Sequence, residues 1–446
     1  MPSWNETHAS TLQRLGIAIP EILLPKSGTD LSKWSIVACD QYTSDHAYWN
    51  QVEAIVGTAP STLRLTLPEI YLESPDVASR IAKIHEAMAE YTARGILESQ
   101  GEGLIYLQRT TEHSGTRHGL VVAMDLERYD YASDSKSLIR ATEGTIVDRI
   151  PPRLAVRQSA LLELPHIMIL VDDPGHTVVE ALDGRTAQLP VAYDVELIQK
   201  GGHLKGWKVQ GQAVGDVLAK LDALLSEAMS VQGERPLFWA VGDGNHSLAT
   251  AKASWKEIKN ELEAAGESRE SIFSHPARFA LAEIVNIHSP GLFFEPIHRA
   301  VFTKDIPELT ETVLSETTAE VSKIHEEDLA KLLASPRGQD KAGYFDGKNW
   351  YLLAYSQDKQ LPTAWVDDLF GRFQKSEPGA RIDFIHGWES AKKLVTEGAA
   401  VFFTPVIARE RLFQWVQENG PLPKKSFSMG HAEEKRNYFE ARRIVR

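Results

Sequence analysis

The sequence predicts an α/β or α+β protein with mixed sheets, flanking helices and two lobes. One observation is that helical and strand-like patterns alternate along the chain. Another is the segment PLFWAVGDGNHSLATAKASW (236–255), in which a short apolar stretch runs into Gly-Asp-Gly and then into a helical pattern. At such a helix start, exposed amides and the helix dipole favour an anion.

Each expected element follows from its residue pattern, taken in chain order. Apolar residues at spacings of three and four predict helices, and short apolar runs that stop at turn residues predict buried strands. The strand before the glycine loop covers 237–241, and Asn245 or Ser247 is expected to cap the helix that follows. The remaining predictions are a helix over 76–92, strands in GLIYLQR, HGLVVAMDL and HIMILVDD, helices over 216–231 and 252–265, and strands in AGYFDGKNWYLLAY and AAVFFTPV.

Turn residues indicate where the lobes divide. The stretch DDPGHTVVEALDGRTAQLPVAYDVE (172–196) has short strand patterns and turn glycines, which predicts a β-rich excursion. We therefore expect a boundary between residues 205 and 235. The prediction is an N-terminal α/β lobe over 1–230 that carries Glu143 and an arginine segment, and a C-terminal α/β lobe over 231–446 that carries the glycine loop.

Composition restricts the class of protein. The 446 residues are 43% hydrophobic, which is enough for two or three ordinary domains. One cysteine, Cys39, excludes a disulfide framework and fits a reducing cytosol. The first residues lack a signal-peptide pattern, and no apolar run approaches the roughly 20 residues of a membrane helix. We expect a cytoplasmic protein with no membrane partner, and leave homo-oligomerisation open.

The charge distribution points to the kind of ligand. A formal net charge of -13 opposes nucleic-acid binding, so no nucleic-acid partner is expected. Arginines nevertheless concentrate in VDRIPPRLAVRQ (147–158) and in EARRIVR (440–446). Local cations in an acidic protein suit a small phosphorylated substrate better than a polymer.

The glycine loop has competing interpretations. Gly242-Asp243-Gly244 followed by Ser247 is one glycine short of the GxGxxG fingerprint. The helix continues where a second strand ending in an acidic residue should follow, which disfavours a Rossmann site, and no GxxxxGK[ST] motif occurs. The glycines could also serve only a tight turn, but Asp243 and His246 have no evident role in such a turn.

Several motifs together resemble one family. VGDGNHSLATAK is similar to the signature of the family catalogued as domain of unknown function 1015, whose members typically carry DGHHR before a helix. Seven further segments resemble the longer branch of this family: WSIVACDQYTSDHAYW, STLRLTLPEIYL, IRATEGTIVDRIPPR, ELPHIMILVDDP, VNIHSPGLFFEPIHR, RIDFIHG and GPLPKKSFSMGHAEEKR. These segments cover nearly the whole chain in order, so the chain is identified as a member of this family.

A more distant likeness suggests what the loop binds. The family's loop is similar to the DGxHR-type loop of ParB-like and sulfiredoxin-like proteins, including free-serine kinases, where it holds nucleotide phosphates. The resemblance implies a phosphate cradle at residues 242–247, made by Gly242, Asp243, Gly244, Asn245, His246 and Ser247. Ser247 stands where relatives have arginine, so the bidentate phosphate contact must come from elsewhere or the chemistry differs.

The segment IRATEGTIVDRIPPRLAVRQ offers replacements for that arginine. Its two prolines would begin a helix that carries Arg153 and Arg157 four residues apart, with Arg149 just before it. Glu143 matches the glutamate of an HEKT-like segment in shorter relatives, which makes it the candidate general base. The alternative is that these are a loop acid and solvated helix charges.

Further candidates come from strand ends and from the resemblance. Asp172, after HIMILV, and Asp243 are the candidate Mg²⁺ ligands, although Asp-Asp-Pro-Gly is also good turn chemistry. The family's PTHR-like motif implies a ligand role for His298 and Arg299. Lys425 and Ser426 could hold a phosphate tail, and Asp40, Gln41 and Tyr42 could line the pocket. Cys39 is expected to be a small buried residue.

The sequence therefore predicts a phosphotransferase with Glu143, Asp243 and His246 as its catalytic residues. It would use ATP or ADP with Mg²⁺ and a small hydroxylated metabolite as acceptor, free serine being one candidate. A phosphatase or nucleotide hydrolase with water as acceptor, and a nucleotide-sensing protein without catalysis, remain as alternatives.

Overall fold

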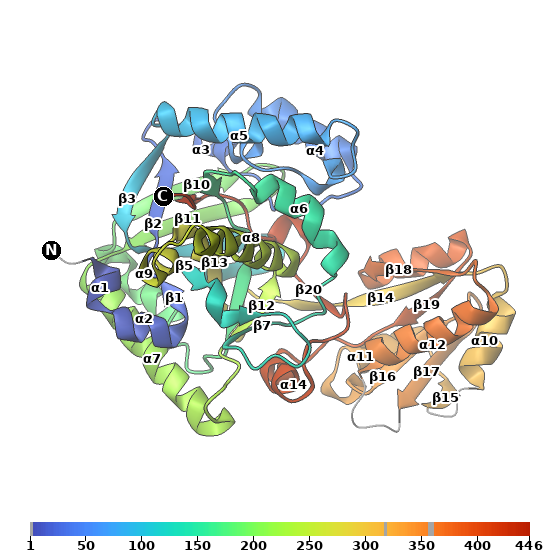
Figure 1. Ribbon diagram of the computed structural model, residues 1–446. Helices are drawn as coiled ribbons and strands as arrows, with labels where there is room; N and C mark the ends of the chain where they lie inside the picture. Colours follow the sequence, from blue (N-terminus) through green and yellow to red (C-terminus); the bar gives the residue numbers. More distant parts are fainter. Residues whose placement is uncertain (1–2, 316–318, 356–360) are drawn as a thin grey trace. The chain divides into compact units, whose positions relative to one another are not determined.

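The computed structural model describes residues 3–315, 319–355 and 361–446, and these form two compact units (Figure 1). The first unit contains the chain up to Leu292 together with Val416–Pro421 and His431–Arg446. The second contains Phe293–Trp415 and Leu422–Gly430. Each unit has its own sheet with flanking helices, so the expected mixed α/β class is confirmed.

A mixed sheet forms the centre of the first unit. In the described residues it has ten strands in the order β10-β11-β4-β5-β13-β9-β12-β7-β6, with β1 paired to β5. The pairs β13–β9, β12–β7 and β7–β6 are parallel, and the others are antiparallel. The strands are β1 (Ile17–Ala18), β4 (Leu104–Thr111), β5 (Gly115–Asp125), β6 (Tyr129–Asp130), β7 (Ile139–Ala141), β9 (Met168–Val171), β10 (Val191–Leu197), β11 (Gly202–Val209), β12 (Trp239–Asp243) and β13 (Phe279–Asn286).

Helices cover both faces of this sheet. Successive side chains of a strand point to opposite faces, and in β4 Tyr106 joins one apolar cluster whereas Ile105 joins another. α7 (Gln212–Gln232) and α8 (Asn245–Ala264) complete the first cluster, and α5 (Val77–Ala93) completes the second. The shorter elements are α1 (Trp4–Thr7), α2 (Ala9–Leu15), α3 (Leu31–Trp34), α4 (His46–Val56), α6 (Ile150–Arg157), α9 (Arg269–Phe273), and the pairs β2 (Glu21–Pro25) with β3 (Leu97–Glu102) and β8 (Leu162–Glu163) with β21 (Arg442–Arg443).

The second unit has a smaller sheet in the order β15-β17-β16-β19-β14-β18, with β20 paired to β14. α10 and α12 contribute to one apolar cluster, and α11 and α13 contribute to another. Its elements are β14 (Phe294–Phe302), α10 (Ile306–Leu314), β15 (Ala319–Lys323), α11 (Glu326–Leu333), β16 (Lys341–Phe345), β17 (Trp350–Tyr355), α12 (Pro362–Ser376), β18 (Arg381–His386), α13 (Trp388–Lys393), β19 (Ala399–Phe403) and β20 (Phe427–Met429). The division between the units falls within α14 (Leu412–Asn419): residues up to Trp415 belong to the second unit, and Val416 and the residues after it belong to the first.

The division into units differs from the boundary expected near residue 230. β12 pairs with β7 and β9 of the large sheet, so the glycine loop and α8 belong with residues 1–230. The stretch 172–196 was expected to be rich in short strands. It instead contains a 3₁₀ helix, Glu180–Gln188, before the strand β10. No described helix combines the length and the apolar character needed to cross a membrane.

Candidate functional site

The glycine loop turns the chain sharply from β12 into α8. Gly244 has a left-handed backbone (φ +76°), and its N–H donates to Asp243 Oδ1 at 2.9 Å. A Cβ at residue 244 would lie 3.0 Å from Ile167 Cα, so glycine is required for both conformation and space. Gly244 is also the N-cap, which makes the expected cap at Asn245 or Ser247 wrong. Since no side chain caps α8, its positive N-terminus favours an anion there.

One polar atom at the start of α8 has no partner among the described residues. Asn245 Oδ1 is buried and accepts no hydrogen bond from them. Buried side-chain oxygens in folded proteins nearly always have a protein or water partner. The loop therefore offers an acceptor that a ligand or an ordered water could satisfy.

Lys435 supplies a positive charge beside the loop. Its Nζ lies 3.1 Å from Asp243 Oδ2, and the residue is only 7% exposed. Asp40 belongs to the same group of charges: burial opposes its ionisation, but His166, a hydrogen bond from Gln41 and the charge of Lys435 together hold the pKa of Asp40 below its usual value. His166 Nε2 lies 3.6 Å from Asp40 Oδ2, and Nδ1 shares a 2.7 Å hydrogen bond with Tyr438 OH. The loop thus has an ammonium group near two carboxylates.

Cys39 is linked to His166 through Tyr438, whose hydroxyl contacts both residues. Tyr438 OH donates to Cys39 Sγ at 2.9 Å. Burial raises the pKa of the Cys39 thiol, and the charge of Asp40 raises it further. A thiol that stays protonated is a poor nucleophile. Cys39 is only partly buried, whereas a fully buried residue was expected.

Glu143 lies near the glycine loop because β7 runs parallel to β12. Ala141 is opposite Val241 in the register, and Glu143 and Asp243 each follow two residues later. Thr142 Oγ1 donates to Val241 O at 2.6 Å, which holds the two strand ends together. Adjacent strands lie about 5 Å apart, so the two carboxylates extend from neighbouring strand ends.

His246 connects the same two segments. Its Nε2 accepts a 3.3 Å hydrogen bond from the backbone N–H of Ile146. A neutral imidazole that accepts at Nε2 carries its proton on Nδ1. In that tautomer, Nδ1 is the donor nitrogen of the His246 ring.

The three arginines of the α6 region have different partners. Arg153 forms a two-pronged pair with Glu69, Nε to Oε1 at 2.7 Å and Nη2 to Oε2 at 2.5 Å. Arg157 Nη2 lies 2.7 Å from Glu163 Oε2. Arg149 is exposed, and no described carboxylate forms an ion pair with it. The expected helix with Arg153 and Arg157 one turn apart is present as α6, but both of these guanidinium groups already have carboxylate partners.

Asp172 does not lie with Asp243. β9 and β12 are antiparallel, and Asp243 is opposite Met168, the first residue of β9. Asp172 follows the last residue of β9, so it extends from the opposite end of the strand. It is exposed and lies 2.7 Å from His288 Nε2. The two predicted Mg²⁺ ligands are therefore not brought together.

The remaining predicted ligand residues belong to the second unit. His298 is 2% exposed, and burial lowers its pKa to about 3, so the imidazole is neutral. Arg299 is fully buried; its Nε lies 3.1 Å from Asp367 Oδ1, and its Nη1 donates to Lys425 O. Ser426 Oγ donates to Pro423 O at 2.7 Å. These contacts hold the second unit together, and a ligand role for its residues stays a prediction.

The sequence analysis missed Lys435 and His166. Lys435 belongs to the motif GPLPKKSFSMGHAEEKR, in which the predicted phosphate ligands, Lys425 and Ser426, lie nearer the start. Its contact with Asp243 spans 192 positions of the chain, counted from 243 to 435. A local sequence pattern cannot predict a contact between residues so far apart in the chain. The only signal for Lys435 is its place in the motif GPLPKKSFSMGHAEEKR.

A comparison with family models identifies the chain. The model described as protein of unknown function (DUF1015) matches residues 23–375, which is most of the chain. The chain therefore belongs to this family, as its motifs predicted. No curated protein matches it by sequence.

Solved structures give only distant likenesses. A conserved hypothetical protein from Pyrococcus furiosus has a TM-score of 0.36 and 10% identity over 73% of this chain and 95% of its own. A free serine kinase in complex with AMP has a TM-score of 0.37 and 11% identity over 73% of this chain and 91% of its own. SbnI from Staphylococcus aureus, truncated at its C-terminus, has a TM-score of 0.36 and 8% identity over 70% of this chain and 82% of its own. At these scores the likenesses decide nothing about activity.

Proposed function

We propose that the protein is a small-molecule kinase that binds ATP or ADP at residues 242–247 and phosphorylates a hydroxylated metabolite, with free serine the first acceptor to test. One observation carries the proposal: the uncapped start of α8, the Asp243–Lys435 pair and the segment that contains Glu143 meet at adjacent ends of β7 and β12. This arrangement combines anion-binding amides, a cation and two carboxylates, which are the groups that phosphoryl transfer uses.

Each residue has a specific proposed role. The amides at the start of α8 and Lys435 Nζ bind phosphate oxygens, and His246 donates through Nδ1. Lys435 then takes over part of the function of the arginine that relatives carry at position 247, as a point charge instead of a planar fork. Asn245 Oδ1, buried without a described partner, accepts from the ligand or from its water.

Asp243 is the proposed Mg²⁺ ligand. Its two oxygens already accept from Gly244 N and pair with Lys435 Nζ, and each oxygen keeps a further lone pair. Mg²⁺ is commonly held by one or two carboxylates plus phosphate oxygens, and its charge would offset the charge of the phosphates. Asp172 extends from the opposite end of β9, so we assign it no part in this site.

Glu143 is the proposed general base. Its carboxylate takes the proton of the acceptor hydroxyl as the acceptor oxygen bonds to the terminal phosphorus of the nucleotide. The bond from that phosphorus to the bridging oxygen breaks, so ATP leaves as ADP, or ADP leaves as AMP. The products are the phosphate ester and the shortened nucleotide, and the proton remains on Glu143 until solvent removes it.

Phosphorus-31 NMR of the purified protein with ATP or ADP, Mg²⁺ and L-serine tests the proposal. We expect a serine phosphate ester and loss of the terminal nucleotide phosphate, with no ester when L-alanine, which lacks the hydroxyl, replaces serine. A pool of other hydroxylated metabolites extends the search for the acceptor. Release of inorganic phosphate without any ester would instead indicate a hydrolase, and nucleotide binding without turnover would indicate a sensor.

A pair of variants ties the activity to this site. Asp243→Asn should weaken Mg²⁺-dependent nucleotide binding, whereas the matched change Asp172→Asn should leave it unaltered. Equal effects of the two changes in calorimetry would contradict a site at the glycine loop.

A further inference from the structure

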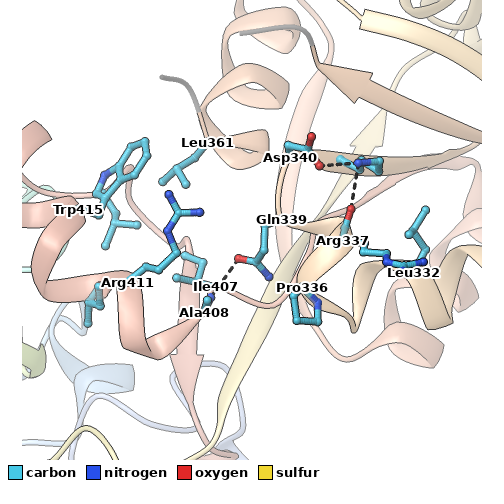
Figure 2. Close-up of a pocket in the computed structure, with 13 residues that line it drawn as sticks. Leu332, Pro336, Arg337, Gln339, Asp340, Leu361, Ile407, Ala408, Arg411 and Trp415 are labelled. Carbon is cyan, nitrogen blue, oxygen red and sulfur yellow. Dashed lines mark hydrogen bonds and ion pairs between the residues drawn. The ribbon is translucent and has the colours of Figure 1, made fainter. Parts of the chain in front are cut away.

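We propose that the second unit contains a separate binding pocket for a small amphipathic carboxylate, a flat apolar body with one anionic end. The pocket is a cavity of about 700 Å³ lined by residues of α11, α14, the turn before β16 and the segment around Ile407 (Figure 2). Cavities of roughly 300–1,000 Å³ hold small organic ligands. All of the lining residues belong to the second unit, so this pocket contains none of the residues of the proposed kinase site.

The walls of the pocket are mainly apolar. Leu332, Ile407 and Leu412 contribute aliphatic surface, and Trp415 contributes an aromatic ring. Apolar and aromatic walls with a few polar groups are typical of sites for organic ligands. An indole ring on one side favours a flat ligand that can stack on it.

The charged groups of the pocket favour an anion. Three cations and one carboxylate line it, namely Arg337, Lys341, Arg411 and Asp340, so its formal charge is +2 in a protein of net charge -13. Lys341 Nζ is already bound by Asp340 Oδ1 at 2.5 Å and by Arg337 O at 2.9 Å. In the described part of the chain, no carboxylate pairs with the guanidinium group of Arg337 or Arg411.

Arg411 is the residue best placed to bind the anionic end. Its side chain extends between Trp415 and Gln339 toward Leu361 (Figure 2). Arginine presents a planar fork that matches the two oxygens of a carboxylate. A ligand that stacks on Trp415 and meets Arg411 with its carboxylate satisfies both features of the pocket at once.

One wall of the pocket is already rigid. The Gln339 amide is held at both ends, since Nε2 donates to Val406 O and Oε1 accepts from Ala408 N at 3.1 Å. These bonds fix the segment around Ile407 against the turn before β16. A wall that needs no rearrangement costs a ligand less to bind.

Calorimetry with indole-3-acetate and its neutral amide, indole-3-acetamide, tests the proposal on the full chain. We expect the acid to bind, the amide to bind at least tenfold more weakly, and Arg411→Gln to lower the affinity for the acid at least tenfold. Arg269→Gln, the same change at an exposed arginine outside the pocket, should leave the affinity unchanged. Arg337→Gln shows which of the two guanidinium groups meets the anion, and circular dichroism confirms that each variant is folded.

The contrary outcomes are distinct from those of the kinase proposal. Three results would each overturn the proposed ligand site. They are no binding of the acid at millimolar concentration, equal binding of acid and amide, and unchanged affinity for the acid in both Arg411→Gln and Arg337→Gln. Competition between ADP and the acid would also overturn it as a separate site. Failure of the kinase assay leaves all of these results unaffected, since no kinase residue lines the pocket.

Discussion

Replacing Lys435 with methionine separates its structural role from its proposed role toward phosphate. Lys435 Nζ lies 3.1 Å from Asp243 Oδ2, and the two side chains are 9% and 22% exposed. With an effective dielectric constant of about 20, Coulomb's law gives a gross attraction of roughly 5 kcal/mol. Desolvation of both groups offsets most of that attraction. We therefore expect Lys435→Met to lower the free energy of unfolding by about 1–3 kcal/mol, between the values for exposed and for buried pairs.

The same change should lower nucleotide affinity by about 10- to 100-fold, because a charge-assisted contact to phosphate contributes roughly 1.5–3 kcal/mol. Adding Asp243→Asn removes the carboxylate that Lys435→Met leaves unpaired. The double variant should thus regain stability in urea unfolding but should not regain nucleotide affinity in calorimetry. If Lys435→Met bound nucleotide as the wild type does, Lys435 would be only the partner of Asp243, and the phosphate role would be refuted.

Three further predictions concern the base, the loop and pH. Glu143→Gln should lower turnover on the identified acceptor by about 10²- to 10⁴-fold while calorimetry shows nucleotide binding retained, and full turnover would exclude Glu143 as the base. Gly244→Ala should lower stability by about 1–3 kcal/mol in urea, because a side chain at φ +76° is strained and its Cβ would lie 3.0 Å from Ile167 Cα; unchanged stability and nucleotide affinity would mean that the loop tolerates a side chain. Burial lowers the pKa of His298 to about 3, so only the unfolded chain gains a proton there as pH falls from about 6.5 toward 3, and stability is lost over that window. Between pH 7 and pH 5 this loss is roughly 2 kcal/mol, and His298→Gln should reduce the change in urea midpoint, whereas an identical pH dependence in the variant would contradict a buried neutral imidazole.

Local patterns predicted most of the elements near the site. The helix expected over 76–92 is α5, Val77–Ala93, and the one expected over 216–231 is α7, Gln212–Gln232. The two prolines correctly predicted the start of α6, because proline needs no hydrogen-bond partner in the first turn of a helix. These features depend on residues within one or two turns of each other, which a sequence displays directly.

The helix cap of α8 shows where local reasoning fails. Asn245 and Ser247 are good capping residue types, but Gly244 takes the N-cap position in a left-handed conformation. At this position a Cβ would lie 3.0 Å from the Cα of Ile167, a residue 77 positions earlier in the chain, counted from 167 to 244. The pattern predicted a strand, a glycine turn and a helix, but not this contact between residues far apart in the chain.

Long-range contacts also decide which predicted site residues can act together. Parallel pairing of β7 with β12 brings the region of Glu143 to the glycine loop, which no spacing in the sequence indicates. Antiparallel pairing of β9 with β12 separates Asp172 from Asp243, although each aspartate stands at the end of an apolar run in the sequence. The glycines beside Asp243 made it the better predicted metal ligand, but strand direction is a property of the whole sheet, so the sequence alone could not show that Asp172 lies at the opposite end.

Charge at the loop depends on the C-terminal segment. Ser247 cannot supply the cation that relatives carry at this position, and the Arg153 and Arg157 guanidinium groups are paired with Glu69 and Glu163. Lys435 lies beside Asp243 because its own segment is anchored: Arg436 Nη1 lies 2.6 Å from Glu283 Oε2 in the large sheet. A buried pair of this kind is costly to break once one partner is lost. The pair that anchors Arg436 therefore helps to hold the backbone that carries Lys435, so the C-terminal segment contributes the cation beside the glycine loop.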